Sequence, residues 1–479
     1  MQSVWSDSCS FRRRDSLNSD IDVEAVVIGA GMAGLLTAYM LKNKGVEPIV
    51  IDAKSIASGV TQNTTAKITS QHYLIYDKLI KNFGKSSAFQ YAMANETAIR
   101  KYEEIVNKEN IDCDFEVVPA YIYSLDESGK SKLKNEWEAA KELGIDAELT
   151  DSLNLPLDIK CALKYNNQAQ FNPLKFLQAI SEKLTIYENT RALDVKENLV
   201  ITERGKITAR HVVVATHYPI INVPGYYFAR MHQSRSYALA LENAQKVDGM
   251  SIDVAEGGYS FRNYKNLLIF GGASHRTGEN QQGGKYDELR EASQKLFPDS
   301  VEKYHWSAQD CVPLDEVPYI GRYSAQTENM YVATGFNKWG MTGSMVSAMI
   351  ISDMIINREN KFSEVFTPQR FEVTSSITNF MHDTAEVAKN FLAQKFELPK
   401  EYIEKIKRGH GGIVAVNGDQ AGVYKDESGR TFIVSTKCPH LGCQLQWNAD
   451  ELTWDCPCHG SRFDYHGKWI GSPSIKDIQ

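Results

Sequence analysis

The sequence predicts an α/β domain followed by a small all-β module. Near the N-terminus, an apolar, β-branched run at residues 25–28 meets a turn with Gly29, Gly31 and Gly34, and apolar side chains then recur at helical spacing. Near the C-terminus, four of the eight cysteines lie between residues 438 and 458, and this crowding suggests a metal site. The length of 479 residues leaves room for two or three domains of about 150 residues each.

The first strand and its turn predict a dinucleotide-binding site. The first glycine permits the tight turn, the second lets the backbone approach a pyrophosphate, and the third lets the helix pack on the strand. A second apolar strand at residues 48–51 ends on Asp52, about 20 residues beyond the glycines, where a carboxylate accepts hydrogen bonds from a ribose diol. A purely structural glycine turn is the alternative, and the second strand with its terminal acid argues against it.

Composition and charge argue against several classes of protein. Hydrophobic residues make up 42% of the chain and charged residues 24%, values that are ordinary for a globular protein. The net charge of -7 gives no basic field for nucleic acid, and we expect the arginine triplet at residues 12–14 to be a solvated tail. The sequence contains no run of about 18 apolar residues, so we expect no transmembrane helix. The N-terminus lacks the apolar core of a secretory signal. We therefore expect a cytoplasmic protein.

A polar stretch at residues 55–71 follows the second strand. It carries Ser58, Thr61, Thr65 and Ala66 among other small residues. Its hydroxyls and free backbone donors suit a loop and a helix start that lie against a bound dinucleotide. A capped helix with a polar first turn is the alternative.

The middle of the chain predicts an inserted substrate-binding portion of mixed α and β structure. Helical patterns cover residues 73–110 and 130–143, whereas residues 112–184 mix strands with helices. A buried strand at residues 211–216 ends in small residues that include Ala215. In a dinucleotide fold such a strand ends beside the cofactor.

Residues 226–310 predict a large antiparallel sheet over the cofactor, because β-like runs alternate there with glycine-rich turns. Tyr259, Arg262, His275 and Arg276 are candidates to line a substrate pocket on this sheet. Taken one at a time, each fits a surface or packing role better.

Four stretches together resemble the D-amino-acid oxidase-like family of FAD-dependent oxidoreductases, which includes glycine oxidase and sarcosine oxidase. They are the glycine turn with Asp52, residues 58–61, residues 315–321 and residues 333–342. The resemblance covers roughly residues 20–360. It implies FAD rather than NAD as the resident cofactor, and hydride removal from a C–N bond at the flavin N5.

The resemblance also implies roles for single residues. Lys338 falls near the position where such enzymes keep a cation for the substrate carboxylate, with a solvated loop lysine as the alternative. Independently of the resemblance, Arg262 on the predicted sheet is a second candidate for contact with substrate. Covalent flavin is not predicted, because Cys311 is displaced from the attachment position of sarcosine oxidase. No second glycine fingerprint provides an NAD site. The residues expected to hold FAD are Gly29, Gly31, Gly34, Asp52, Ser58, Thr61, Thr65, Ala66, Ala192, Ala215, Gly335, Gly340, Met341 and Thr342.

The chain divides into four expected parts. The C-terminal module begins with β-like runs at residues 413–416, 421–424 and 431–435. An apolar helix face in the linker before it is expected at Met381, Ala385, Val387, Ala388, Phe391 and Leu392. The parts are an arm at residues 1–22, the oxidoreductase domain at 23–360 with substrate-binding portions at about 112–184 and 226–310, a helical linker at 361–408, and the module at 409–479.

Two loops of the module carry the metal-site pattern. One reads Cys-Pro-His-Leu-Gly-Cys from residue 438, and the other reads Cys-Pro-Cys-His-Gly-Ser from residue 456. Together they resemble the Rieske [2Fe-2S] signature, which implies that Cys438 and Cys456 ligate one iron and that His440 and His459 ligate the other. A structural zinc site is the alternative, and the two mirrored loops argue against it.

Further residues of these loops resemble the cytochrome-bc-complex type of Rieske protein, in which the positions matching Cys443 and Cys458 form a disulfide. Ser461 matches a donor to a cluster sulfur, whereas Phe463 stands where high-potential relatives carry a tyrosine hydroxyl. Losing one donor makes reduction harder, so we expect a potential below those of such relatives.

These features predict an FAD-dependent oxidoreductase that oxidises a small amine or amino acid at a C–N bond. We expect electrons to pass from reduced FAD through the cluster to an external acceptor. Two alternatives stay open: a partner reduces the cluster and FAD then reduces the substrate, or the Rieske domain is a structural or redox-sensing module. An aromatic-ring dioxygenase is disfavoured, because no 2-His-1-carboxylate iron domain follows the module.

Overall fold

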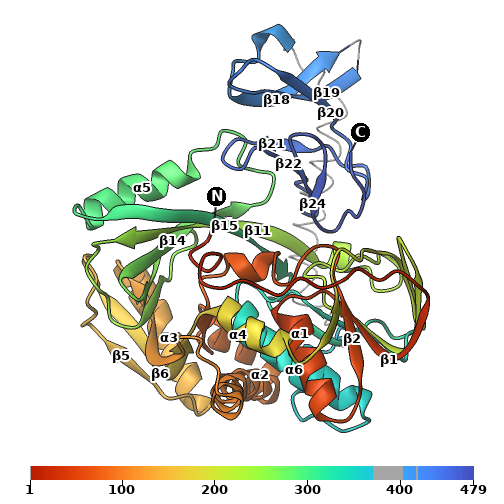
Figure 1. The fold of residues 1–479 in the computed structure, drawn as a ribbon. Helices are drawn as coiled ribbons and strands as arrows, with labels where there is room; N and C mark the ends of the chain where they lie inside the picture. Colours follow the sequence, from red (N-terminus) through yellow and green to blue (C-terminus); the bar gives the residue numbers. More distant parts are fainter. Residues whose placement is uncertain (1, 371–402, 417–418, 479) are drawn as a thin grey trace.

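The computed structural model describes residues 2–370, 403–416 and 419–478 (Figure 1). A large body formed by residues 2–370 carries the C-terminal module on one side. Of the predicted linker, a short helix α7 (Ser363–Phe366) and a 3₁₀ turn η3 (Ile403–Lys405) are described. The apolar face expected from Met381 to Leu392 lies outside the described residues.

One sheet carries the glycine turn at the end of its central strand, β1 (Ile21–Ile28). Strand β1 is parallel to both of its neighbours, β2 (Pro48–Ile51) and β10 (Lys206–Val214). Val27 points into the larger core beneath the helices, whereas Val26 points into a second core on the opposite face, as the two-residue period of a strand requires. The other strands of this eight-stranded sheet, counted over the described residues, are β7 (Thr185–Tyr187), β8 (Ala192–Lys196), β9 (Leu199–Thr202), β16 (Tyr319–Arg322) and β17 (Met330–Thr334).

Two helices pack side by side against this sheet. Helix α1 (Met32–Asn43) begins directly after the glycine turn, and α6 (Gly340–Ile355) begins a few residues after β17. Leu36 and Met345 are fully buried in the core that they share. Because each helix follows a parallel strand, both helix N-termini lie at the carboxyl edge of the sheet, where ligands bind in folds of this kind.

The second sheet joins both portions that the sequence assigns to the substrate. Strands from residues 226–310 are antiparallel in the order β15-β11-β14-β13-β12, as predicted. Strand β12 then pairs in parallel with β4 of the first portion, a joining that the sequence pattern did not predict. The strands of this nine-stranded sheet, counted over the described residues, are β3 (Lys67–Ile68), β4 (Glu116–Ser124), β5 (Ala147–Thr150), β6 (Cys161–Gln170), β11 (Met231–Glu242), β12 (Met250–Asp253), β13 (Ser260–Tyr264), β14 (Leu267–Arg276) and β15 (Val301–Pro313).

Helices predicted at residues 73–110 and 130–143 are confirmed as α2 (Ile75–Glu109) and α3 (Glu127–Glu142). Helix α2 is kinked at Gly84, whose φ of 78° is not helical. Further helical segments are α4 (Pro173–Ser181), α5 (Lys285–Leu296), and the short 3₁₀ segments η1 (Val60–Asn63) and η2 (Tyr227–Ala229).

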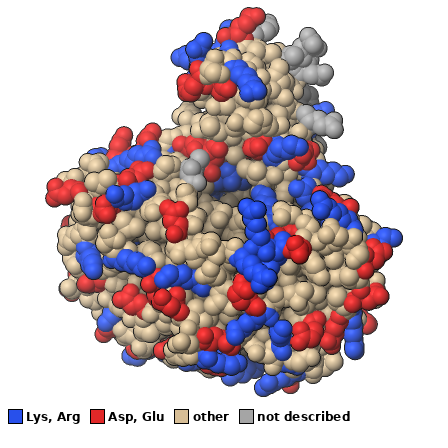
Figure 2. Space-filling model, in the orientation of Figure 1, with Lys and Arg blue, Asp and Glu red and all other residues tan. Residues whose placement is uncertain are grey.

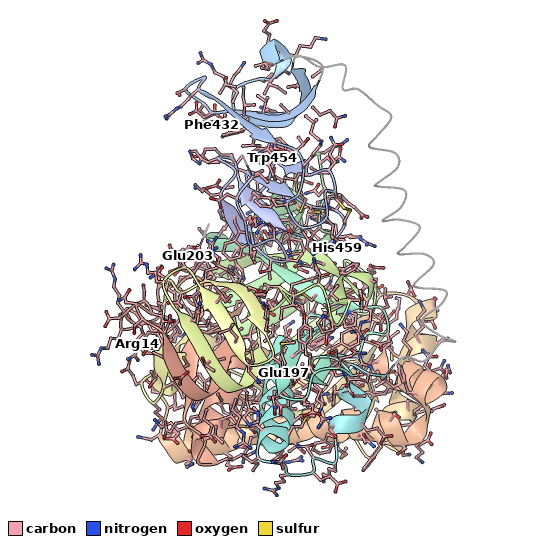
Figure 3. The ribbon with its side chains drawn as sticks, turned by 90° about the vertical axis from the view of Figure 1, so that its right-hand side faces the viewer. Arg14, Glu197, Glu203, Phe432, Trp454 and His459 are labelled. Atoms are coloured by element: carbon pink, nitrogen blue, oxygen red, sulfur yellow. A yellow bond between two sulfur atoms is a disulfide. The ribbon has the colours of Figure 1, made fainter. Side chains whose placement is uncertain are left out.

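The N-terminal arm packs onto the body instead of trailing into solvent. Trp5 is fully buried, and its Nε1 donates a 2.7 Å hydrogen bond to the carbonyl oxygen of Thr64. The expectation that the arginine triplet is a solvated tail is wrong for Arg14 (Figure 3). Its side chain is 15% exposed and forms a 2.9 Å ion pair with Glu182. Its backbone N–H donates a 2.9 Å hydrogen bond to Glu188, so the chain is held against the body at this residue.

The C-terminal module is built from two small antiparallel sheets, and its first three strands confirm the predicted runs. Trp454 and Phe463 are fully buried in its core. The two cysteine-containing loops lie on the side that faces the body, where Figure 3 labels His459. The strands are β18 (His410–Val416), β19 (Asp419–Lys425), β20 (Thr431–Ser435), β21 (Gln446–Asn448), β22 (Thr453–Asp455), β23 (Arg462–Asp464) and β24 (Trp469–Gly471).

Charges of both signs are interspersed over the face drawn in Figure 2, without an extended basic patch. Over the described residues, no helix combines the length and the apolar character that a membrane span needs. The cytoplasmic location stays a prediction.

Candidate functional site

A cavity of about 530 Å³, lined by residues of both large sheets, lies beside the glycine turn. Gly29 has a φ of 113°, and a Cβ there would lie 2.4 Å from the carbonyl oxygen of Ala215. A Cβ on Gly34 would lie 1.9 Å from the carbonyl oxygen of Gly29, so only glycine lets α1 pack against the turn. Gly31 lines the cavity, and a Cβ added to it would lie 3.2 Å from Oγ1 of Thr61. The bare backbone can therefore approach a pyrophosphate closely.

Asp52 marks one end of the cavity. Its Oδ2 accepts a 2.7 Å hydrogen bond from the N–H of Ala30, and its Oδ1 accepts a 2.8 Å bond from the N–H of Lys54. Burial raises the pKa of this carboxyl, and the two N–H groups act in the opposite direction. The carboxyl group is thus held in one orientation at the cavity wall, with lone pairs left for a ligand.

The loop before α6 forms another part of the wall. Lys338, with a φ of 71°, lines the cavity together with Gly340 and Met341. Trp339 stacks on His72 with ring centroids 4.8 Å apart. The first turn of α6 is therefore fixed against the body.

The residues that the sequence predicts for cofactor binding fall into two groups. Most of them line the cavity: Gly29, Gly31, Asp52, Ser58, Thr61, Thr65, Ala192, Ala215, Gly340 and Met341. The others stand behind this wall: Gly34, Ala66, Gly335 and Thr342. Thr342 illustrates the second group, because its hydroxyl donates a 3.2 Å hydrogen bond to the carbonyl oxygen of Thr69.

Charged side chains of both signs line the cavity between the loop before α6 and the second sheet. Burial raises the pKa of Asp310 to about 6, although Lys338 and Arg235 oppose the rise. Burial lowers the pKa of Lys338, with Asp310 and Glu256 acting against it. Burial also lowers the pKa of Lys67 to about 7. Sequence reasoning did not single out Asp310 or Lys67 for the substrate, since only the folded sheet places Asp310 near Lys338 and Lys67 at the cavity wall.

Arg262 does not take the place expected from the sequence. Its guanidinium is buried and donates hydrogen bonds to the carbonyl oxygens of Thr65 and Ala66, at 2.8 and 2.7 Å. It does not line the cavity, and neither do Tyr259, His275 and Arg276. The expectation that Arg262 contacts the substrate is therefore corrected. Its guanidinium instead supports the backbone of the polar stretch at residues 55–71, part of which forms the cavity wall.

The two loops of the module bring Cys438, His440, Cys456 and His459 together. The two thiols are buried, and the two imidazole rings have centroids 5.0 Å apart. The predicted disulfide between Cys443 and Cys458 is confirmed.

The donor set fits a cluster bound by two thiolates and two imidazoles. The sulfurs of Cys443, Cys456 and Cys458 lie within 4.8 Å of one another, but the disulfide leaves only Cys456 of these three as a thiolate ligand. Nδ1 of His440 is buried without a hydrogen-bond partner. Its Nε2 is engaged at 2.7 Å with Oδ1 of Asn222, so Nδ1 is the nitrogen left for a metal.

The second cysteine–histidine loop touches the cavity wall through two glutamines. Nε2 of Gln233 donates to the carbonyl oxygen of His459 at 2.6 Å, and Nε2 of Gln309 donates to that of Gly460 at 2.8 Å. Both glutamines line the cavity. Phe228 of the body lies edge-on to the ring of His459, at a centroid distance of 5.9 Å. One layer of side chains thus separates the cavity from the loop.

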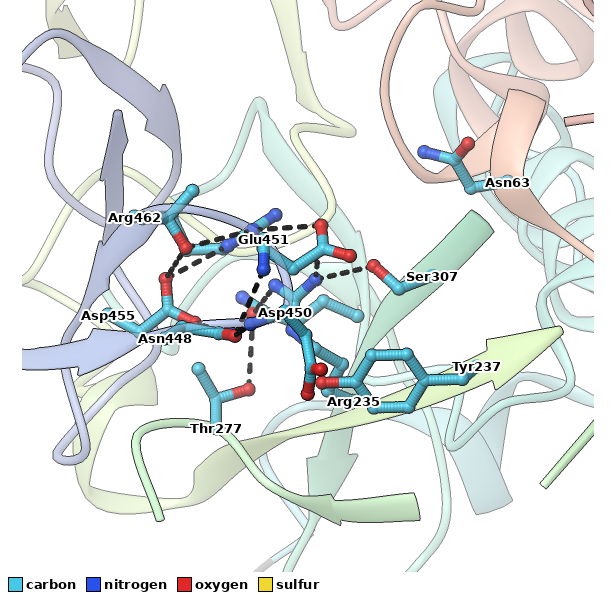
Figure 4. A network of polar contacts seen from close by, with 12 residues as sticks. Asn63, Arg235, Tyr237, Thr277, Ser307, Asn448, Asp450, Glu451, Asp455 and Arg462 are labelled. Atoms are coloured by element: carbon cyan, nitrogen blue, oxygen red, sulfur yellow. Dashed lines mark hydrogen bonds and ion pairs between the residues drawn. The ribbon is translucent and has the colours of Figure 1, made fainter. Parts of the chain in front are cut away.

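An ionic network fastens the module to the body beside this contact (Figure 4). Glu451 of the module pairs with Arg235 of β11 at 3.4 Å and with Arg462 at 3.3 Å. Arg462 also pairs with Asp455 at 3.1 Å. Arg235 is 1% exposed, so the network is buried and its charges satisfy one another.

The family model of FAD dependent oxidoreductases matches residues 24–354. The chain belongs to this family. A second model, that of the Rieske [2Fe-2S] domain, matches residues 398–479. FAD and a Rieske [2Fe-2S] cluster are therefore the cofactors of this oxidoreductase, and the glycine turn and the free Nδ1 of His440 fit them.

Relatives of this oxidoreductase agree with both assignments. YhfW of Bacillus subtilis (strain 168), which carries the name of a Rieske 2Fe-2S iron-sulfur protein, is 38% identical over 100% of this chain and 97% of its own. Among solved structures, L-proline dehydrogenase from P. horikoshii has a TM-score of 0.61 at 18% identity, covering 74% of this chain and 98% of its own. Glycine oxidase from Geobacillus kaustophilus has a TM-score of 0.60 at 16% identity, covering 73% and 99%. These two likenesses show the fold.

Proposed function

We propose that this oxidoreductase oxidises a small amine or amino acid at a C–N bond and passes the electrons through its Rieske domain to an external acceptor. The observation that carries the proposal is the glutamine contact: Gln233 and Gln309 line the cavity and also hold the loop of His459. Bound FAD takes up two electrons with a hydride, and the cluster carries one electron at a time. The short separation supports transfer between them inside one chain.

The charges in the cavity support a substrate with both an amine and a carboxylate. Lys338 offers a cation for the carboxylate, and the Asp310 carboxylate offers an acceptor for the nitrogen. With a pKa near 6, Asp310 is mostly ionised at neutral pH. Glycine oxidase and L-proline dehydrogenase, which share the fold, are named for substrates of this kind.

An anaerobic reduction experiment tests the proposal. A panel of amines and amino acids is added to the FAD- and cluster-loaded protein, with flavin bleaching followed optically and the cluster followed by electron paramagnetic resonance. We expect an amino acid to bleach the flavin and a reduced Rieske signal to appear afterwards. A flavin that no amine bleaches, but that accepts electrons from a chemically reduced cluster, would establish the reverse direction and refute the amine assignment. A bleached flavin with a cluster that stays oxidised would point to a structural or sensing module.

A further inference from the structure

The end of the Rieske domain forms part of the wall of the FAD cavity. Its contribution is a segment around β24 together with Arg462. At this end the wall of the oxidoreductase domain is made by Asp52, Lys54, Thr190, Arg191 and Ala192. The Rieske residues at the cavity are Arg462, Trp469, Ile470, Gly471, Ser472 and Ile475.

Two cations of the oxidoreductase domain hold this segment in place. Nζ of Lys54 donates to the carbonyl oxygen of Ile470 at 3.1 Å and lies 5.0 Å from the centroid of the Trp469 ring. The guanidinium of Arg191 lies 4.6 Å from the same centroid, and its Nη1 donates to the carbonyl oxygen of Ile475 at 3.2 Å. Cation–π contacts and hydrogen bonds thus close this end of the cavity with the Rieske domain.

The closed end still has donors without acceptors. Among the described residues, Nε1 of Trp469 and Nε of Arg191 are buried without hydrogen-bond partners. Buried donors in proteins are rarely left unpaired, and both belong to residues that line the cavity. A ligand that brings acceptor atoms and negative charge to this end would satisfy them. The same end holds Asp52, placed for a ribose diol.

We propose that the Rieske domain is part of the FAD-binding site, with Trp469 and Arg191 holding the adenosine diphosphate half of the cofactor. A ligand that contacts both domains binds more tightly when the Rieske domain is docked on the oxidoreductase domain than when it is not. The free energy by which FAD stabilises docking therefore equals the free energy by which docking stabilises FAD binding. This inference depends on the FAD assignment but not on the substrate or on the direction of electron flow.

The test compares full-length, cluster-loaded variants after removal of FAD. Titration with FAD, followed by flavin fluorescence, gives the dissociation constant. We expect Trp469→Ala and Arg191→Ala each to raise it about ten-fold, the size of one lost hydrogen bond to a charged or buried partner. Phe432→Ala is the matched control, because Phe432 is a half-buried aromatic residue at the far end of the same domain (Figure 3), and it should leave the constant unchanged. An unaltered paramagnetic resonance signal of the reduced cluster shows that the domain is folded.

FMN lacks the adenosine and one of the two phosphates of FAD, so it distinguishes a lost contact at the adenosine end from a general disturbance of the cavity. We expect both variants to bind FMN as the parent protein does. Parent-like FAD affinity in Trp469→Ala and Arg191→Ala, or an equal loss of FMN affinity, would overturn the proposal. Amide hydrogen exchange adds the reciprocal measurement: FAD should slow exchange in peptides covering residues 469–475 but not around Phe432. Exchange that FAD leaves unchanged at residues 469–475 would contradict the coupling.

Discussion

Replacing Glu451 by glutamine is the sharpest perturbation of the contact between the two domains. The carboxylate pairs with Arg235 across the interface and with Arg462 inside the Rieske domain, and it accepts a 2.9 Å hydrogen bond from the hydroxyl of Tyr286. Glutamine has the same shape and can keep the bond from Tyr286. The change Glu451→Gln therefore removes the charge and little else.

The expected loss follows from the burial of this network. Two unit charges about 4 Å apart attract each other by about 4 kcal/mol at an effective dielectric constant of about 20. Arg235 is 1% exposed and Glu451 11%, so the desolvation of both groups offsets part of this attraction. We expect Glu451→Gln to lower the free energy of undocking or unfolding of the Rieske domain by about 2 kcal/mol.

Urea unfolding, followed by the visible absorbance of the cluster, measures this loss. The control is Glu427→Gln, the same change at an exposed position of the same domain, which we expect to stay within about 0.5 kcal/mol of the parent protein. A Glu451→Gln variant that also stays within this range would refute the reasoning, because the network would then contribute nothing to docking.

The same variant predicts a pH dependence. Burial alone would raise the pKa of Glu451, but Arg235 and Arg462 outweigh it and hold the pKa below its usual range. A carboxyl whose folded-state pKa is depressed contributes stability above its unfolded pKa of about 4.3, and this contribution is lost as the pH falls through the folded-state pKa. The difference between the parent protein and Glu451→Gln should therefore shrink below about pH 4. A difference that stays constant down to pH 3 would contradict the sign of this shift.

Three further predictions concern the FAD cavity. Lys338→Met should raise KM for an amino acid about 10- to 100-fold and leave KM for the matching amine without a carboxylate unchanged, in steady-state assays with both substrates. Burial raises the pKa of Asp310 to about 6. Under the proposed contact between its carboxylate and the substrate nitrogen, KM should fall as the pH rises through 6, and Asp310→Asn should lose this pH dependence. Gly34→Ala puts a Cβ 1.9 Å from the carbonyl oxygen of Gly29, so the purified variant should carry less FAD per cluster, as measured by absorbance.

Features that depend on neighbouring residues were predictable from the sequence. The glycine turn is an example, because Gly29, Gly31 and Gly34 act within one turn and one helix start. The pairing of Cys443 with Cys458 was implied by the family resemblance of two short loops, and the structure has it. The glycine turn is one segment of about ten residues, and the cysteine pair lies on two short loops 15 residues apart, so the residue types and their spacing carry most of the information.

Features that depend on strand register were not predictable. Gln233 and Gln309 meet because β11 and β15 pair over most of their length, which places their amides at 2.6 Å. No local pattern distinguishes these two glutamines from surface residues. Arg262 shows the opposite error: its type and strand suggested a substrate contact, but the side chain turns away from the cavity toward backbone carbonyls. Which side of a wall a residue occupies is a property of the packed sheet.

The docked arrangement also bears on how a partner could reach the cluster ligands. His440 is occupied at Nε2 by Asn222, and Phe228 lies edge-on to the rings of both His440 and His459. The imidazole edge therefore faces the oxidoreductase domain and its cavity wall. A partner that exchanged electrons at this edge would have to displace residues 222–228, so it would compete with the cavity for the same face. A partner that bound elsewhere on the Rieske domain would leave the contact through Gln233 and Gln309 in place.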